Sequence, residues 1–132
     1  MTILIVEDEE ILRKVLKEKF EENDYSVVLA TDGEAVIDLA RKNKPRLILL
    51  DLILPKKDGF EVLKDLKSDF ELKHIPVIVL SNLGQDEGIK KAFDLGATDY
   101  IIKTQHPVNE IVEKVKHVLL AGNGRTGRQA SS

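Results

Sequence analysis

The sequence has no cysteine, so disulfides, a catalytic thiolate and zinc sites built from cysteine are excluded. Long apolar runs are missing too: stretches such as Ile75 to Leu80 are far shorter than the roughly 20 residues that a membrane-spanning helix needs. The N-terminus has no signal-peptide pattern, because a strand-like run starts at once. These absences lead us to expect a cytoplasmic protein that has no membrane partner.

An excess of positive charge is also absent. Lysine and arginine number 20 against 23 acidic residues, which gives a formal net charge of −3. The last eleven residues, "GNGRTGRQASS", hold two arginines and no acid, so the preceding 121 residues carry −5. Proteins that bind nucleic-acid backbones present a basic stripe, and we therefore expect no direct contact with nucleic acid.

The residues that are present suit one globular domain. With 132 residues, 42% of them hydrophobic and 33% charged, the chain can bury a core and is too apolar to be disordered. β-Rich apolar runs alternate with segments of helical periodicity. The expected strands are 2–6, 25–30, 46–51, 75–81 and 98–103, and the expected helices cover 9–22, the residues after Thr31, those after Gly59, 86–95 and those from Pro107 onward.

The expected strands are mostly continuous apolar runs, which is typical of a parallel sheet covered on both faces. Five strand-then-helix units joined by short loops predict an α/β fold, a doubly wound five-stranded parallel sheet with helices on both faces. Thr31 and Glu34 are expected to cap the second helix as a capping box. Residues 1–121 are expected to form this domain, whereas 122–132 lack large apolar side chains and are expected to be a flexible tail.

Polar side chains stand where the expected strands end. Glu7 and Asp8 follow the first strand, Asp51 ends the third, Ser81 the fourth and Lys103 the fifth. Because ligands of such sheets bind beyond the carboxyl ends of the strands, these five side chains are expected to converge. Each alone could be an ordinary polar residue at a strand end, but the five together indicate a site.

Three acids at one site need positive charge. Two carboxylates about 4 Å apart repel each other by about 4 kcal/mol at an effective dielectric near 20, and Lys103 could offset one acid but not three. Mg²⁺, a hard cation that prefers a few carboxylates and waters, is therefore the expected cofactor. With the metal and Lys103 in place, Asp51 becomes a plausible nucleophile. A phosphoryl group on Asp51 would meet Mg²⁺, Lys103 and Ser81.

Four motifs resemble those of response-regulator receiver domains of the CheY-like family: "ILIVEDEE" (3–10), "LLDLILPKKDG" (49–59), "VIVLS" (77–81) and "GATDYIIK" (96–103). Their order and their positions on the expected elements make the resemblance specific, and it covers nearly the whole expected domain. It implies a domain that accepts a phosphoryl group from a sensor histidine kinase or a phosphotransfer protein in a Mg²⁺-dependent reaction and then changes conformation. It further implies that an effector binds the face formed by the fourth helix, the fifth strand and the fifth helix.

The resemblance also assigns roles to individual residues. Asp51 would accept the phosphoryl group, Lys103 and Ser81 would hold its oxygens, and Tyr100 together with Ser81 would form the conformational switch. The metal ligands that it implies are Asp8, Asp51, the backbone carbonyl of Ile53 and, through a water, Glu7.

Two positions depart from the usual pattern of the family. Asn82 stands where a small residue is common, and Thr104 stands where proline is common. In this family the residues two beyond the acceptor and two beyond the hydroxyl position flank the path of the hydrolytic water. Here they are Ile53 and Leu83, both apolar, so we expect slow self-dephosphorylation and no enzyme activity beyond it.

Other functions remain open at the level of the sequence. An aspartate-nucleophile phosphohydrolase, resembling the haloacid dehalogenase family, also phosphorylates a strand-end aspartate, but it needs a second acid two residues later, where this chain has Ile53. A receiver-like module that is never phosphorylated is opposed by the complete set of acids together with Ser81 and Lys103. A flavodoxin-like cofactor site is disfavoured because "EDEE" (7–10) would repel phosphate.

Overall fold

The computed structural model describes residues 1–82 and 86–124, and for residues 122–124 it describes only the helical backbone. Within these residues, five strands alternate with five α-helices. The elements in chain order are β1 (Thr2–Val6), α1 (Glu10–Glu22), β2 (Ser26–Ala30), α2 (Val36–Asn43), β3 (Leu47–Leu50), α3 (Gly59–Ser68), β4 (Val77–Ser81), α4 (Asp86–Asp94), β5 (Asp99–Ile102) and α5 (Val108–Gly124). Short 3₁₀ turns, Gly33–Ala35 and Lys103–Gln105, precede α2 and α5.

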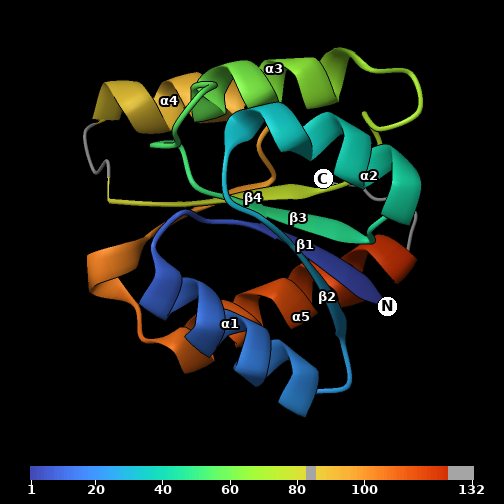
Figure 1. Cartoon of the computed structure of the whole chain (residues 1–132), viewed down its shortest axis with the longest axis vertical. Coiled ribbons are helices and arrows are strands. Elements are labelled where there is room, and N and C mark those ends of the chain that lie inside the picture. The colour runs from blue at the N-terminus through green and yellow to red at the C-terminus, as the bar shows by residue number, and fades with distance from the viewer. Residues whose placement is uncertain (83–85, 125–132) are drawn as a thin grey trace.

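The strands form one parallel sheet in the order β2-β1-β3-β4-β5. Helices α1 and α5 cover one face of the sheet, and α2, α3 and α4 cover the other (Figure 1). The predicted fold, a doubly wound five-stranded parallel sheet with helices on both faces, is therefore confirmed. The strand order reverses between β1 and β3, and the crevice beyond the carboxyl ends of those two strands is where such sheets bind ligands.

Alternate residues of the same strand enter two different cores. On β1, Leu4 and Val6 pack under α2 and α3, whereas Ile3 and Ile5 pack against α1 and α5. All four are at most 1% exposed. Burial of one such aliphatic side chain stabilises the fold by about 1.5–3 kcal/mol. The strands are continuous apolar runs because both of their faces are buried, and the first polar residue after each run marks the edge of the sheet.

Two local predictions, the cap before α2 and the end of the fifth strand, differ from the structure. The cap before α2 is Asp32, whose Oδ1 accepts hydrogen bonds from the amides of Glu34 (2.9 Å) and Ala35 (3.1 Å), so the predicted Thr31 capping box is wrong. Asp32 is the cap because its backbone is extended and its short carboxylate reaches those amides. Lys103 begins the 3₁₀ turn after β5 and is not the last residue of the strand.

The predicted tail also overlaps a helix. Helix α5 continues to Gly124 and so includes the first three residues, 122–124, of the expected tail. Residues 125–132 lie outside the described part of the chain, so the division into a domain and a tail stays a prediction. None of the helices in the described residues is both long and apolar enough to cross a bilayer.

Gly59 fixes how closely α3 approaches the loop after β3. A Cβ at this position would lie 2.4 Å from the Cα of Leu52 and 2.6 Å from the backbone oxygen of Asp51. We expect Gly59→Ala to lower the free energy of unfolding by about 1–3 kcal/mol, because the backbone has to shift. Gly88→Ala in α4 is the matched control, since its Cβ would meet only Phe60 Cζ at 4.0 Å.

Denaturant unfolding measures both variants. Alanine at position 88 should leave stability unchanged or raise it by about 0.5–1 kcal/mol, the usual gain of alanine over glycine in a helix. Equal stability of the two variants would contradict the close approach at Gly59.

Candidate functional site

The polar groups predicted from the sequence meet at the carboxyl edge of the sheet. Glu7 follows β1, Asp51 follows β3, and Ser81 is the last residue of β4. Among the residues that the structure describes, these three are the only buried polar or charged ones, with exposed fractions of 1%, 4% and 0%. In the described part of the chain, buried polar groups therefore gather at one place, which indicates a functional site and not unrelated polar residues at strand ends.

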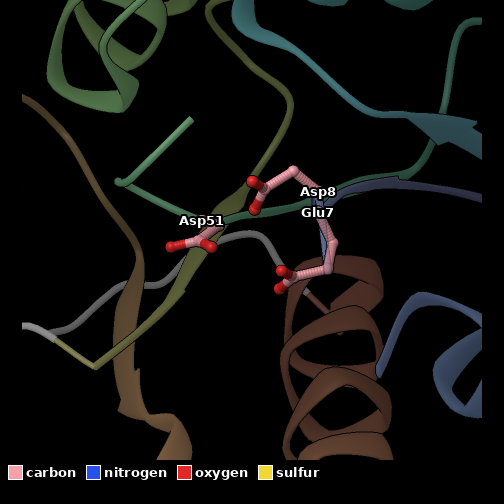
Figure 2. Close-up of side chains that lie close together, drawn as sticks. All are labelled: Glu7, Asp8 and Asp51. Atoms are coloured by element: carbon pink, nitrogen blue, oxygen red, sulfur yellow. The ribbon is translucent and has the colours of Figure 1, made fainter. Parts of the chain in front are cut away.

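Three carboxylates form an acidic cluster at this edge. Glu7, Asp8 and Asp51 each offer one oxygen, and the three oxygens lie within 4.8 Å of one another. Figure 2 shows the side chains extending from the neighbouring ends of β1 and β3. Glu7 and Asp51 are buried, whereas Asp8 is exposed. The cluster is thus open to solvent on the side of Asp8.

Lys103 supplies the positive charge. Its Nζ lies 2.9 Å from Asp51 Oδ2 and 2.8 Å from Glu7 Oε1, and its side chain is only 9% exposed. Burial acts to lower the pKa of Lys103, but the hydrogen bonds that it donates to the surrounding carboxylates outweigh this effect and raise the pKa above its ordinary value. The sequence predicted that Lys103 could offset one acid, whereas the structure places it against two of the three predicted acids.

Glu7 remains incompletely compensated. Its Oε1 is close to Lys103 Nζ but makes no hydrogen bond of good geometry, and it is buried. Burial raises the pKa of Glu7, the charge of Asp51 acts in the same direction, and the contacts with Lys103 oppose both only in part. A buried carboxylate whose charge is only partly compensated, inside a set of three carboxylates, fits a hard divalent cation such as Mg²⁺.

Two residues that the sequence analysis missed also shape the site. Glu9 places its Oε1 3.0 Å from Lys103 Nζ, and its backbone amide donates to Glu7 Oε2 at 3.1 Å. Arg13 donates from Nη1 to the backbone carbonyls of Glu7 and Asp8, both at 3.1 Å, and so holds the loop that carries two acids. In the sequence, Glu9 was one acid of an acidic motif and Arg13 one cation on a helix, so neither gave a signal of its own.

Ser81 and Tyr100 lie on neighbouring strands. Their side chains are joined by a hydrogen bond, which acts to lower the pKa of Tyr100, but burial of the ring has the larger effect and raises it. The charge of Asp51 also raises the pKa of Tyr100, as expected for a hydroxyl close to the acceptor. The structure therefore brings together the two residues of the predicted switch, while the switching itself stays a prediction.

The remaining predicted residues lie around the acceptor. The amide of Ile53 donates to Asp51 Oδ1 at 3.2 Å, and Ile53 is 58% exposed. Coordination of a metal by the Ile53 carbonyl stays a prediction. Asn82 and Thr104 are exposed and line one groove beside Lys103. Leu83 lies outside the described residues.

Stability should respond to Mg²⁺ if the acidic cluster binds it. Binding to the folded state alone stabilises a protein by about 2.7 kcal/mol at a hundredfold excess over the dissociation constant. Asp8→Ala removes the exposed carboxylate and should abolish this gain. Glu18→Ala, which removes an exposed acid from the middle of α1, should keep it. Denaturant unfolding across a Mg²⁺ titration measures the gain, and a wild-type unfolding free energy that does not change would contradict the site.

Comparison with known proteins finds relatives over nearly the whole chain. The sequence model of the family described as "Response regulator receiver domain" matches residues 3–116. Transcriptional regulatory protein SrrA of Staphylococcus aureus is 37% identical over 128 residues, which are 97% of this chain and 52% of SrrA. The chain thus spans about half the length of the curated relatives that it matches.

Solved structures show the same similarity in three dimensions. The phosphorylated cyanobacterial phytochrome response regulator RcpA is 35% identical, with a TM-score of 0.79 over 92% of this chain and 94% of RcpA. The Mn(2+)-bound form of response regulator Rcp1 is 28% identical, with a TM-score of 0.76 over 98% of this chain and 99% of Rcp1.

Proposed function

The chain belongs to the response regulator receiver domain family of two-component signalling, and from this premise we propose that its chemical step is phosphoryl transfer to Asp51. The observation that carries the proposal is the buried Asp51 carboxylate, held 2.9 Å from Lys103 at the switch point of the sheet. A carboxylate that is fixed in place beside a cation is a competent nucleophile. The similarity to RcpA, whose solved form is phosphorylated, supports the same reaction.

Each neighbouring side chain has a role in this step. The Ile53 amide donates a hydrogen bond to Asp51 Oδ1, and Lys103 donates one to Oδ2. Together the two hydrogen bonds orient the carboxylate. Lys103 would then pair with an oxygen of the incoming phosphoryl group, and the Ser81 hydroxyl would donate to another. Phosphoryl transfer depends chiefly on such positioning and on stabilisation of the developing charge.

Mg²⁺ is the proposed cofactor. Glu7, Asp8 and Asp51 would hold it, with the Ile53 carbonyl as a further ligand and Glu7 acting through a water. The bound metal would neutralise negative charge shared between the acceptor and the phosphoryl oxygens. Rcp1, which was solved in a Mn(2+)-bound form, supports a divalent-cation site in this fold.

Partners and location follow from the family. We infer that a sensor histidine kinase or a phosphotransfer protein donates the phosphoryl group in the cytoplasm. We also infer that the output passes through the face of α4, β5 and α5, because Tyr100 on β5 joins this face to Ser81. Helix α4 also carries an exposed aromatic residue, Phe93. SrrA, a transcriptional regulatory protein, is about twice as long as the part that this chain matches, so transcriptional control is not carried over to this chain.

One incubation distinguishes a receiver domain from an aspartate-nucleophile phosphohydrolase. With a small acyl phosphate and Mg²⁺, a receiver domain gains the mass of a single phosphoryl group and then stops. A phosphohydrolase instead turns over phosphate monoesters repeatedly, which requires a general acid near the acceptor. Ile53 occupies the place where that acid is needed, so we expect a single labelling event and no sustained turnover.

A further inference from the structure

Glu9 contacts Lys103 of the site although it is not part of the acidic cluster. Its Oε1 lies 3.0 Å from Lys103 Nζ, between residues 94 positions apart in the sequence. The Glu9 side chain is 59% exposed, whereas those of Glu7 and Asp51 are 1% and 5% exposed. Lys103 therefore contacts two buried carboxylates on its inner side and one exposed carboxylate on its outer side.

The position of Glu9 in the chain makes this contact specific. Glu9 is the N-cap residue of α1, yet its side chain makes no hydrogen bond to the helix. Serine, threonine, aspartate and asparagine are the usual caps, because their short side chains reach the free amides. The longer Glu9 side chain extends across to Lys103 instead, so its contribution is to the site and not to the end of the helix.

An incoming phosphoryl group has to compete for the same ammonium. Lys103 has three N–H donors, and three carboxylates surround it. Releasing a buried carboxylate leaves a desolvated charge without its partner, which is costly. Releasing exposed Glu9 costs little, because water replaces the lysine. Before the transfer, exposed Glu9 is therefore the carboxylate that Lys103 releases at the lowest cost when a phosphoryl oxygen approaches.

Glu9 also stands on the solvent side of the site. With Lys103, Asn82 and Ile11 it lines an open groove of about 450 Å³. A free acyl phosphate that approaches along this groove meets the Glu9 carboxylate before it meets Lys103. Both the competition for Lys103 and the repulsion between like charges oppose small anionic donors.

We propose that Glu9 is a positioning residue that holds Lys103 from the solvent side and slows phosphorylation of the domain by free acyl phosphates. The inference rests on the proposed phosphorylation of Asp51. In that step an Asp51 oxygen forms a bond to phosphorus, and the bond from phosphorus to the acyl oxygen breaks. The carboxylate that leaves keeps the electron pair, so no proton has to be supplied. Glu9 takes no part in the bond changes and acts only through Lys103.

Two variants, each of which neutralises one of two neighbouring acids, test the role of Glu9. Glu9→Gln removes the ion pair while keeping the size of the side chain, and Glu10→Gln removes the next charge along, from an exposed residue in the first turn of α1. Mass spectrometry follows labelling by acetyl phosphate in Mg²⁺ and yields a second-order rate constant for each protein. We expect Glu9→Gln to react about two- to fivefold faster than the wild type, the range that an exposed ion pair implies.

The dependence of the labelling rate on salt distinguishes an electrostatic role of Glu9 from an effect on folding. The excess rate of Glu9→Gln over the wild type should shrink at high ionic strength, because salt screens an exposed pair, whereas a change in folding would not respond in this way. Circular dichroism checks that both variants are folded. A rate of Glu9→Gln equal to that of Glu10→Gln, or slower than the wild type, overturns the proposal. If the wild type is not labelled at all, the proposed function fails and this inference fails with it.

Discussion

An Asp51→Asn chain gains no phosphoryl group from acetyl phosphate and Mg²⁺, whereas the wild type gains one: this is the largest effect that we expect. Asparagine keeps the shape of the side chain but offers a neutral amide oxygen, which is a far weaker nucleophile than a carboxylate. The single side-chain oxygen of asparagine can accept a hydrogen bond from Lys103 or from the Ile53 amide, which donate to different oxygens of Asp51, and the change also removes one charge from a cluster of three carboxylates. The fold should therefore survive while the chemistry is lost.

A second aspartate provides the control for this experiment. Asp58 is exposed and caps α3 by accepting a hydrogen bond from the Phe60 amide at 2.6 Å. Asparagine is as good a helix cap as aspartate, so Asp58→Asn should be labelled as fast as the wild type. Intact-protein mass measures both variants. Undiminished labelling of Asp51→Asn, or an equal loss in both variants, would remove Asp51 as the acceptor.

The sequence was sufficient to predict the architecture, because a sheet that is buried on both faces produces continuous apolar runs. Each strand contributes alternate residues to two cores, so its hydrophobic run continues until the chain leaves the sheet. Asp51 and Ser81 mark those exits directly, which is why the carboxyl edge could be located from the residues alone. The same argument could not place Lys103 in its 3₁₀ turn, because helix and strand ends differ by single residues that periodicity does not resolve.

The contacts between side chains were less accessible to sequence reasoning. Glu9 reaches Lys103 only after five strands have been arranged side by side, and no spacing in the chain encodes a contact across 94 residues. Arg13 reaches two backbone carbonyls, which have no sequence signature at all. Asp32 displaced Thr31 as a helix cap because the backbone conformation decides between adjacent candidates. Local patterns thus predicted the helices, the strands and the edge of the sheet, whereas the network of charged contacts depends on the three-dimensional arrangement of the strands.

The lifetime of the phosphorylated state depends on what surrounds the acceptor. Ile53 is anchored beside Asp51, because its amide donates to Asp51 Oδ1 at 3.2 Å. Ile53 is 58% exposed, so water can reach this side of the loop beside the acceptor. An isoleucine side chain can neither donate nor accept a hydrogen bond. The acceptor therefore lacks, at this position, a group that could orient the attacking water.

Replacing that side chain should shorten the lifetime. Positioned acid–base or hydrogen-bonding groups typically accelerate such steps by about 10²–10⁴-fold, so we expect Ile53→Asn with Leu83→Glu to lose its phosphoryl group at least about tenfold faster than the wild type. Leu83 lies outside the described residues, so the single variant Ile53→Asn tests the part of the argument that rests on the structure. Leu120→Asn, an exposed aliphatic residue on α5, is the control and should decay like the wild type.

The measurement is the loss of phosphorylated protein after the donor is removed, followed by intact mass at fixed Mg²⁺. Exposed Asn82 is a residue next to the site that could orient a water in the wild type, since its amide both donates and accepts hydrogen bonds. Asn82→Ala distinguishes the two possibilities, because it slows decay only if Asn82 already positions the water. Slow decay in the wild type that Asn82→Ala leaves unchanged and Ile53→Asn accelerates is the expected result. Wild-type decay as fast as that of the double variant would show that the apolar side chain at position 53 does not protect the phosphoryl group.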